Sequence, residues 1–272
     1  MVLRILMLGD IVGKPGRQVV QQQLDDLKRE YGPDVVVANA ENAAGGSGLT
    51  PQIFQKLQAY GVHGVTLGDH VYRQRDILPT LEREENIVRP ANLPAAAVGN
   101  RWMILQPDPA KPPLAVLTLL GRLFMTGQQA DDPFAAADEI LEKLPRDAVV
   151  LVEMHAEATS EKVALGHHLD GRVAAVVGTH THIPTADAKI LPGGTGYITD
   201  LGMTGPYDSV LGRRKDRVLQ FMTTAMPAPF DVATDDVRLC GVLLDYNVDA
   251  RRVTHIERIE RKAELDRPPF GE

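Results

Sequence analysis

Short, uninterrupted apolar segments alternate with helical segments along the first two-thirds of this 272-residue chain. Segments that are apolar throughout are typical of strands buried on both faces, whereas a strand with one solvated face alternates apolar and polar residues. The apolar segments cover residues 3–8, 35–40, 64–67, 102–105, 114–120, 148–152 and 174–177. This pattern predicts an α/β fold in which layered β-sheets are covered by helices.

Helix start and stop signals lie between these strands. Thr50-Pro51 supplies an N-cap followed by proline at the first helical position, and Gly61 ends that helix. Other helices are expected over about 18–31, from 132 to about 145, and from about 159. The segment that contains Gly13, Pro15 and Gly16 is predicted to be a loop.

The C-terminal third has a different pattern, because the helical signal fades after Ile190. Residues 237–244 and 252–259 predict an antiparallel hairpin that turns near 249–250. The basic stretch of Arg213, Arg214, Lys215 and Arg217 includes Asp216 and is interpreted as a solvated turn. No repeat or linker is evident, so a single domain spanning residues 1–272 is expected, with a partly antiparallel C-terminal portion.

Charge and composition limit the molecules to which this protein can bind. The net charge is −7 and no dense basic cluster is present, which argues against an extended nucleic acid but permits a small anionic substrate. The single cysteine, Cys240, excludes an internal disulfide and fits a reducing compartment. The first apolar segment is too short for a signal peptide, and none approaches the ~20 residues of a membrane span. We therefore expect a cytoplasmic protein without a membrane partner, and leave open whether it forms a homo-oligomer.

Polar clusters follow five of the predicted strands. They are Gly9-Asp10, Glu41-Asn42, Gly68-Asp69-His70, Glu153-Met154-His155 and Gly178-Thr179-His180-Thr181-His182. Ligands of open α/β sheets gather beyond the carboxyl ends of strands, so these clusters can converge. Carboxylates, an amide and imidazoles without thiolates favour Mn, Fe or Zn over a Ca or Mg site. A carboxylate such as Glu41 can bridge two cations ~3.5–4 Å apart and leave room for an attacking hydroxide.

Each cluster alone also has a purely structural interpretation. Asp10 can form a turn or cap a helix, and His155 can be a buried histidine with ordinary hydrogen bonds. His180-Thr181-His182 is more specific, because residues i and i+2 of an extended segment point the same way. Five such clusters at five strand ends favour a shared metal centre.

The clusters resemble the signature of the calcineurin-like metallophosphoesterases, which runs Asp-x-His, Gly-Asp-x-x-Asp, Gly-Asn-His, His, Gly-His-x-His. Here Ile11-Val12 follows Asp10, and Glu41 is the second carboxylate. These departures are similar to one bacterial branch, the YmdB-type phosphodiesterases. The resemblance spans most of residues 3–212, and its motifs lie at 9–17, 155–162, 178–182, 185–187, 190–195 and 199–205.

The resemblance implies a layered metallophosphoesterase-like fold that holds two metal ions, Fe or Mn, with Zn as an alternative. One metal would be bound by Asp10, Glu41, Asn42 and His182, and the other by Glu41, Asp69, His155 and His180. His70 would contact the phosphate or protonate the leaving oxygen. The implied substrate is a small phosphodiester such as a 2′,3′-cyclic nucleotide, cleaved by hydrolysis.

Asp69 departs even from this branch, which has asparagine at that position. The added negative charge would strengthen metal binding, weaken phosphate attraction, or change the preferred metal. Substrate contacts are assigned to Gly45, Gly46 and Thr179, with a plain loop as the other interpretation of the glycines. Two further functions remain open: a phosphomonoesterase, and a regulatory or scaffold protein with little turnover.

Overall fold

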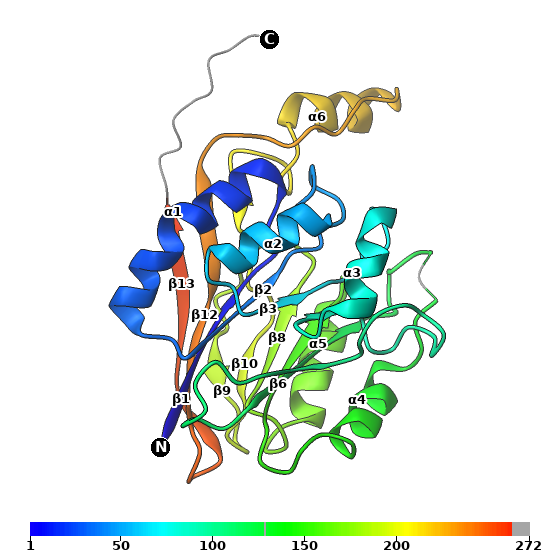
Figure 1. Cartoon of the computed structure of the whole chain (residues 1–272). Coiled ribbons are helices and arrows are strands. Elements are labelled where there is room, and N and C mark those ends of the chain that lie inside the picture. The colour runs from blue at the N-terminus through cyan, green and yellow to red at the C-terminus, as the bar shows by residue number, and fades with distance from the viewer. Residues whose placement is uncertain (128, 263–272) are drawn as a thin grey trace.

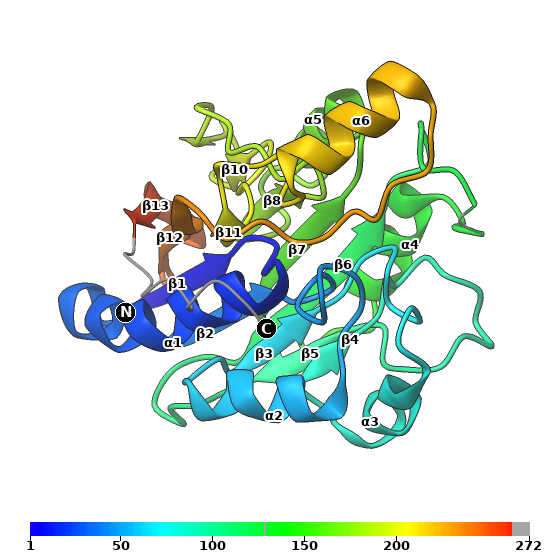
Figure 2. The same cartoon turned by 90° about the horizontal axis from the view of Figure 1, so that it is seen from above.

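A computed structural model describes residues 1–127 and 129–262. Two β-sheets pack face to face, and helices cover the outer face of each sheet, so the molecule has four layers (Figures 1 and 2). The expected fold of sheets covered by helices is therefore confirmed. Among the described residues, no helix is long and apolar enough to span a bilayer.

The first sheet joins the N-terminal strands to the C-terminal hairpin. Its parallel part runs in the order β1 (Val2–Leu8), β2 (Val35–Asn39), β3 (Gly64–Thr66) and β4 (Ile87–Val88). Its antiparallel part contains β12 (Val237–Asn247), which lies beside β1 and pairs with β11 (Gly205–Pro206) and β13 (Arg252–Lys262). The predicted hairpin and the partly antiparallel C-terminal portion are both confirmed.

The second sheet is parallel at its centre and antiparallel at both edges. Its central strands are β6 (Leu114–Leu120), β7 (Val149–His155), β8 (Ala175–Thr179) and β10 (Gly196–Ile198). The edge strands are β5 (Met103–Leu105) and β9 (Lys189–Ile190). All parallel strands of one sheet share a carboxyl edge, which is where polar loops can meet.

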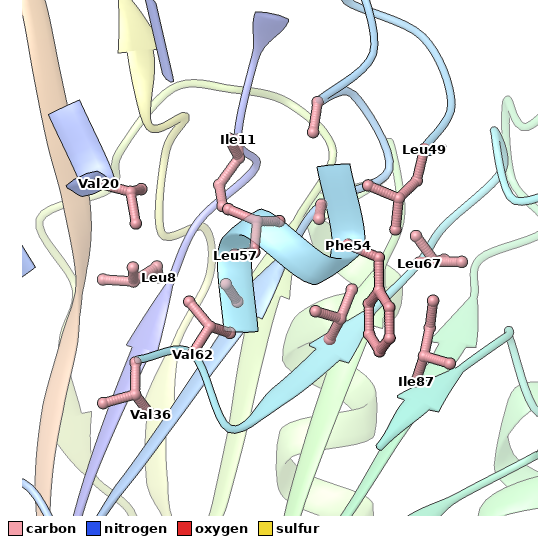
Figure 3. Close-up of a cluster of buried hydrophobic side chains, with 14 of the residues drawn as sticks. Leu8, Ile11, Val20, Val36, Leu49, Phe54, Leu57, Val62, Leu67 and Ile87 are labelled. Atoms are coloured by element: carbon pink, nitrogen blue, oxygen red, sulfur yellow. The ribbon is translucent and has the colours of Figure 1, made fainter. Parts of the chain in front are cut away.

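Three apolar layers explain why the strand segments are apolar throughout. Figure 3 shows the first layer, in which Leu8 and Val36 face Val20 of α1 (Gly13–Tyr31) and Phe54 and Leu57 of α2 (Pro51–Ala59). A second layer fills the space between the sheets, and a third packs the second sheet against α4 (Pro133–Leu141) and α5 (Thr159–His168). Each central strand therefore buries both faces.

The helix α1 begins at Gly13, so the prediction of a loop over Gly13, Pro15 and Gly16 is wrong. Proline is tolerated in a first helical turn, where its missing N–H would have no helical acceptor. Gly16 is needed because a Cβ there would overlap the carbonyl oxygen of Thr204. The Gly13 N–H donates to the Asn42 carbonyl at 2.9 Å, which fixes the start of this helix beside one of the polar clusters.

The basic stretch predicted as a turn is instead the start of α6 (Lys215–Thr224), with Arg214 as its N-cap. This helix buries only Val218, so it carries little of the apolar periodicity that identifies a helix. The short elements η1 (Arg75–Ile77), α3 (Leu78–Arg83) and β4 were not predicted either. They are too short for a periodic pattern to emerge.

Candidate metal centre

The five polar clusters meet at the carboxyl edges of the two sheets. The oxygen and amide donors follow strands of the first sheet: Asp10 after β1, Glu41 and Asn42 after β2, and Asp69 after β3. The three histidines assigned as ligands belong to the second sheet, with His155 ending β7 and His180 and His182 following β8. Packing of the two sheets brings the two kinds of donor together.

Four of these side chains form what we call the four-residue cluster: Glu41, Asp69, His155 and His180. One ligand atom from each lies within 4.8 Å of all the others. His155 Nε2 lies 3.0 Å from Asp69 Oδ1 and 3.4 Å from Glu41 Oε1. His180 Nδ1 lies 3.1 Å from His155 Nε2 and 3.4 Å from Asp69 Oδ1. Two carboxylates and two imidazoles around one point can hold a transition-metal ion.

The remaining three side chains, Asp10, Asn42 and His182, form the Asp10 cluster on the other side of Glu41. Asn42 Nδ2 lies 3.0 Å from Glu41 Oε1 and 3.2 Å from His182 Nε2. His182 Nε2 lies 3.9 Å from Asp10 Oδ1. Glu41 therefore lies between the two clusters, in the position expected of a bridging carboxylate.

The histidines of the His180-Thr181-His182 segment do not reach the site in the predicted way. The backbone is not extended there, because His180 has φ 93° and His182 has φ 65°. The two imidazoles consequently go to different places, with His180 in the four-residue cluster and His182 in the Asp10 cluster. Left-handed φ values at two non-glycine residues are uncommon and require support from the surrounding structure.

His70 lies beside both clusters on the more exposed side. Its backbone N–H donates to Glu41 Oε2 at 3.0 Å, and its Nδ1 lies 2.8 Å from Asn42 Oδ1. Its side chain is 33% exposed, whereas that of Glu41 is 1% exposed. The ring is thus oriented by Asn42 while its edge remains accessible from solvent.

A buried network behind His155 fixes the orientation of that ring. His155 Nδ1 lies 2.9 Å from Thr179 Oγ1, and this hydroxyl donates to Glu153 Oε1 at 2.6 Å. Asn39 Nδ2 donates to the same Glu153 oxygen at 2.6 Å. Because its own hydroxyl donates to Glu153, Thr179 accepts a hydrogen bond from His155 Nδ1–H, which leaves Nε2 free to bind a cation. Thr179 is fully buried, and its hydroxyl is used between His155 and Glu153; its assignment as a substrate contact stays a prediction.

The glycine loop after Asn42 is held by two arginines. Arg213 donates to the carbonyl oxygens of Gly45 and Gly46, and Arg17 donates to the carbonyl of Ala43. Gly45 and Gly46 have φ values of 60° and 87°, which only glycine adopts without strain. A Cβ on Gly45 would meet open space, so this loop presents bare backbone on its outer side.

Burial and close charges shift the pKa values of the clustered groups in different directions. Burial raises the pKa of Asp10 to about 7. Burial also raises the pKa values of Glu41 and Asp69, but the neighbouring histidines outweigh it and lower both. For His155 burial lowers the pKa, yet the charge of Glu41 and the hydrogen bond to Asp69 raise it well above its usual value. The hydrogen bond to Glu41 raises the pKa of His70.

The residues present fit bound cations. Asp10 Oδ1 is buried and has no hydrogen-bond partner among residues 1–127 and 129–262, which is costly unless a cation satisfies it. Gly68 also leaves space at the centre, because a Cβ there would overlap His155 Nε2 and Glu41 Oε2. The donors are oxygen and nitrogen throughout, as Mn, Fe and Zn accept.

Several supporting residues were given no role in the sequence analysis. Asn39, Glu153, Lys162 and Asp200 are buried polar side chains close to the clusters. A usable signal existed for Glu153, since a charged residue directly after an apolar strand segment is rarely buried without a partner. Glu157 is 52% exposed and its Oε2 lies 3.4 Å from His180 Nε2.

Known proteins are similar to this chain in sequence and in fold. Residues 6–259 match the family described as YmdB-like protein. A Bacillus subtilis (strain 168) protein named 2′,3′-cyclic-nucleotide 2′-phosphodiesterase is 43% identical over 258 residues, 94% of this chain and 96% of its own.

Two solved structures are similar over almost their whole length. A Thermus thermophilus protein is 40% identical with a TM-score of 0.89, covering 96% of this chain and 100% of its own. A Mycoplasma pneumoniae phosphatase is 32% identical with a TM-score of 0.90, covering 96% and 94%. The family match covers most of the chain and these relatives agree with it, so the chain belongs to the YmdB-like protein family.

Proposed function

We propose that this protein is a binuclear, metal-dependent phosphodiesterase that hydrolyses small phosphodiesters, with 2′,3′-cyclic nucleotides as its substrates. The observation that carries the proposal is the convergence of the four-residue cluster and the Asp10 cluster on Glu41. The name of the Bacillus subtilis relative supports the substrate class. The net charge of −7 also favours a small substrate over a long polyanion.

In this proposal Asp10, Asn42 and His182 hold one cation and Asp69, His155 and His180 hold the other, with Glu41 shared. The donor set favours iron or manganese, with zinc as the alternative. When bound, the cations polarise the phosphoryl oxygens and provide a nucleophile near neutral pH. The Glu153–Thr179 network keeps His155 Nε2 directed at its cation.

His70 is proposed to protonate the leaving oxygen. Asn42 Oδ1 fixes its Nδ1, so Nε2 is the nitrogen that can approach a substrate. The hydrogen bond to Glu41 raises the pKa of His70, which favours the protonated ring that a general acid requires. Partial exposure allows the ring to regain a proton from water after each turnover.

The loop at Gly45 and Gly46 is proposed to contact the phosphodiester. Arg213 occupies the two carbonyl oxygens, and so turns them away from an incoming anion. Successive backbone N–H groups in left-handed conformations form a concave anion site. The absence of side chains allows close approach of the phosphate to the metals.

We also propose that the chain acts as one domain in the cytoplasm. The apolar layer between the sheets contains residues from both, such as Ile5 and Val116, so neither sheet buries its inner face alone. Cys240 is a free, buried thiol, as suits a reducing compartment.

The test is hydrolysis by Mn²⁺-reconstituted protein of 2′,3′-cyclic AMP, bis-para-nitrophenyl phosphate and para-nitrophenyl phosphate. The proposal expects turnover of both diesters and much slower turnover of the monoester. Preference for the monoester would refute the diesterase assignment and support a phosphomonoesterase. No turnover of any of them, with two metals bound per chain, would support a regulatory or scaffold role.

A further inference from the structure

We propose that the buried ion pair between Lys162 and Asp200 is a positioning device that holds both metal-binding histidines of the His180-Thr181-His182 segment in place. The proposal rests on the metal ligands assigned under the proposed function. Within the described residues, neither residue of the pair makes a hydrogen bond to a ligand side chain, and the sequence motifs that contain them assigned them no role. Their role follows from the hydrogen bonds that they make to this one segment.

Asp200 is the acceptor that organises the middle of the segment. Its Oδ2 accepts from the Thr181 backbone N–H at 3.2 Å and from Thr181 Oγ1 at 2.8 Å. Its Oδ1 accepts from the Gly202 N–H at 2.8 Å, and the Met203 N–H donates to the His182 carbonyl at 3.2 Å. The carboxylate thus ties the peptide between the two histidines to the chain that follows β10.

Lys162 anchors the start of the same segment from α5. Its Nζ donates to Asp200 Oδ2 at 2.7 Å and to the Thr179 carbonyl at 2.7 Å. Lys162 is fully buried, as is Asp200. Its aliphatic part packs under Gly178, where a Cβ would lie 2.9 Å from Lys162 Cδ. Lysine therefore fixes the residue that precedes His180 and neutralises the carboxylate that holds Thr181.

Such support is needed because His180 and His182 both have left-handed φ values. A segment free to relax would move toward ordinary conformations and rotate both rings away from their positions. A buried ion pair is a poor way to gain stability alone, because the cost of desolvating two charges offsets their attraction. A geometric role accounts for its position better than a contribution to stability does.

This role has a specific consequence. His180 belongs to the four-residue cluster and His182 to the Asp10 cluster, so movement of the segment disturbs both. Weakening the Lys162–Asp200 pair should therefore lower Mn²⁺ affinity at both sites together. Loss of any single ligand would instead act mainly on one site.

The decisive experiment compares Thr181→Val with Thr181→Ser in Mn²⁺ titrations followed by the EPR signal of free Mn²⁺. Valine removes the hydroxyl bond to Asp200 with little change in volume, whereas serine retains it. We expect Thr181→Val to weaken both Mn²⁺ sites about 10-fold, as for other residues that orient metal ligands, and Thr181→Ser to restore them. Wild-type affinity at both sites in Thr181→Val, or weakening at only one, would overturn the proposal.

Lys162→Met extends the test, with Arg4→Met as the matched control. Arg4 pairs with Asp245 at 2.6 Å in the first sheet, away from the clusters, so its loss should leave Mn²⁺ affinity unchanged. Folded Lys162→Met should bind Mn²⁺ about 10- to 100-fold more weakly at both sites. A lowered Tm with wild-type affinity would show a merely structural role. If Lys162→Met does not fold, the Thr181 pair decides the question.

The number of Mn²⁺ ions bound by wild-type protein distinguishes failure of this inference from failure of the proposed function. Wild-type protein that fails to bind two Mn²⁺ per chain would refute the proposed metal centre itself. Two bound Mn²⁺ in wild type, with unchanged binding in Thr181→Val, would refute the positioning role alone.

Discussion

The four-residue cluster and the Asp10 cluster share Glu41 but differ in how their own charges are balanced. In the four-residue cluster, Asp69 and Glu41 lie within 3.4 Å of His155, and these carboxylates raise the pKa of His155 well above its usual value. In the Asp10 cluster, Asp10 Oδ1 is buried without a hydrogen-bond partner in the described part of the chain. Burial lowers the pKa of His182, and the ring nitrogens of His182 and His155 lie 3.9 Å and 4.0 Å from Asp10 Oδ1, beyond hydrogen-bond distance.

This difference indicates two ways of preparing a metal site. In the four-residue cluster the nearby carboxylates favour the protonated ring of His155, so a cation bound there would displace a proton. In the Asp10 cluster the buried Asp10 carboxylate is unfavourable when ionised, and a bound cation would neutralise it. The four-residue cluster is thus preorganised without metal, whereas the Asp10 cluster is destabilised until a cation binds.

The largest effect is expected from removal of the group common to both clusters. Glu41→Gln keeps the shape of the side chain but replaces a bridging carboxylate with a neutral amide. We expect loss of Mn²⁺ from both clusters and a fall of roughly 1000-fold in kcat/KM for 2′,3′-cyclic AMP. Metal analysis by mass spectrometry checks this, and retention of one full-affinity site would show that Glu41 does not bridge.

Asp10→Asn should affect the Asp10 cluster alone, because it removes a buried charge whose Oδ1 has no hydrogen-bond partner among the described residues. The pKa of Asp10 is raised to about 7, so its ionisation destabilises the metal-free fold progressively as pH rises from the unfolded value near 4 to about 7. The variant should therefore stabilise metal-free protein by up to ~4 kcal/mol above pH 7 and have no such effect below pH 4.

The same variant should bind one Mn²⁺ in place of two. Urea unfolding of metal-free protein at pH 4 and pH 8, with Mn²⁺ titration at pH 8, measures both effects. Equal stabilisation at the two pH values would contradict the assignment of the buried charge to Asp10.

A smaller effect confined to the four-residue cluster is expected from Glu153→Gln. The amide can still accept from Thr179, but it lacks the charge that favours a proton on His155 Nδ1. We expect about 10-fold weaker Mn²⁺ binding at the four-residue cluster and unchanged binding at the Asp10 cluster.

Glu157→Gln is the matched control for Glu153→Gln, since Glu157 is 52% exposed. Exposed ion pairs contribute little, so it should change affinity at most about 2-fold. Equal effects of the two substitutions would argue against the network behind His155.

Both metals are expected to stay bound in Asp69→Asn, which introduces the asparagine of the family signature that this sequence resembles. Both oxygen ligands and both histidines remain, so two metals should still bind. Removing one negative charge should alter kcat or the order of preference among Mn²⁺, Fe²⁺ and Zn²⁺ by several-fold. Turnover measured with each metal tests this, and loss of a metal from the variant would show that the charge of Asp69 is required for binding.

The strands and the polar clusters at their ends were predictable, because each follows from a local sequence pattern. Backbone conformations that depend on contacts between distant residues were not. The apolar strand segments indicated the layered α/β fold, and the polar residues at strand ends identified the clusters. The backbone at His180 and His182 could not be predicted, because its left-handed φ values depend on Asp200 and Lys162, which are distant in sequence. The start of α1 was missed because proline and glycine, here Pro15 and Gly16, usually indicate a break in a helix. Both lie in the first helical turn, where proline is tolerated and where Gly16 leaves room for the Thr204 carbonyl oxygen.

The division of donors between the two sheets has a consequence for how the protein is made. The carboxylates Asp10, Glu41 and Asp69 emerge from the ribosome long before His180 and His182. A nascent chain that has completed only the strands of the first sheet that precede residue 90 carries acidic groups without any of the ligand histidines. With the ligands proposed above, metal binding would therefore follow the joining of the two sheets. A bound metal pair would then be a sign that strands of both sheets have come together.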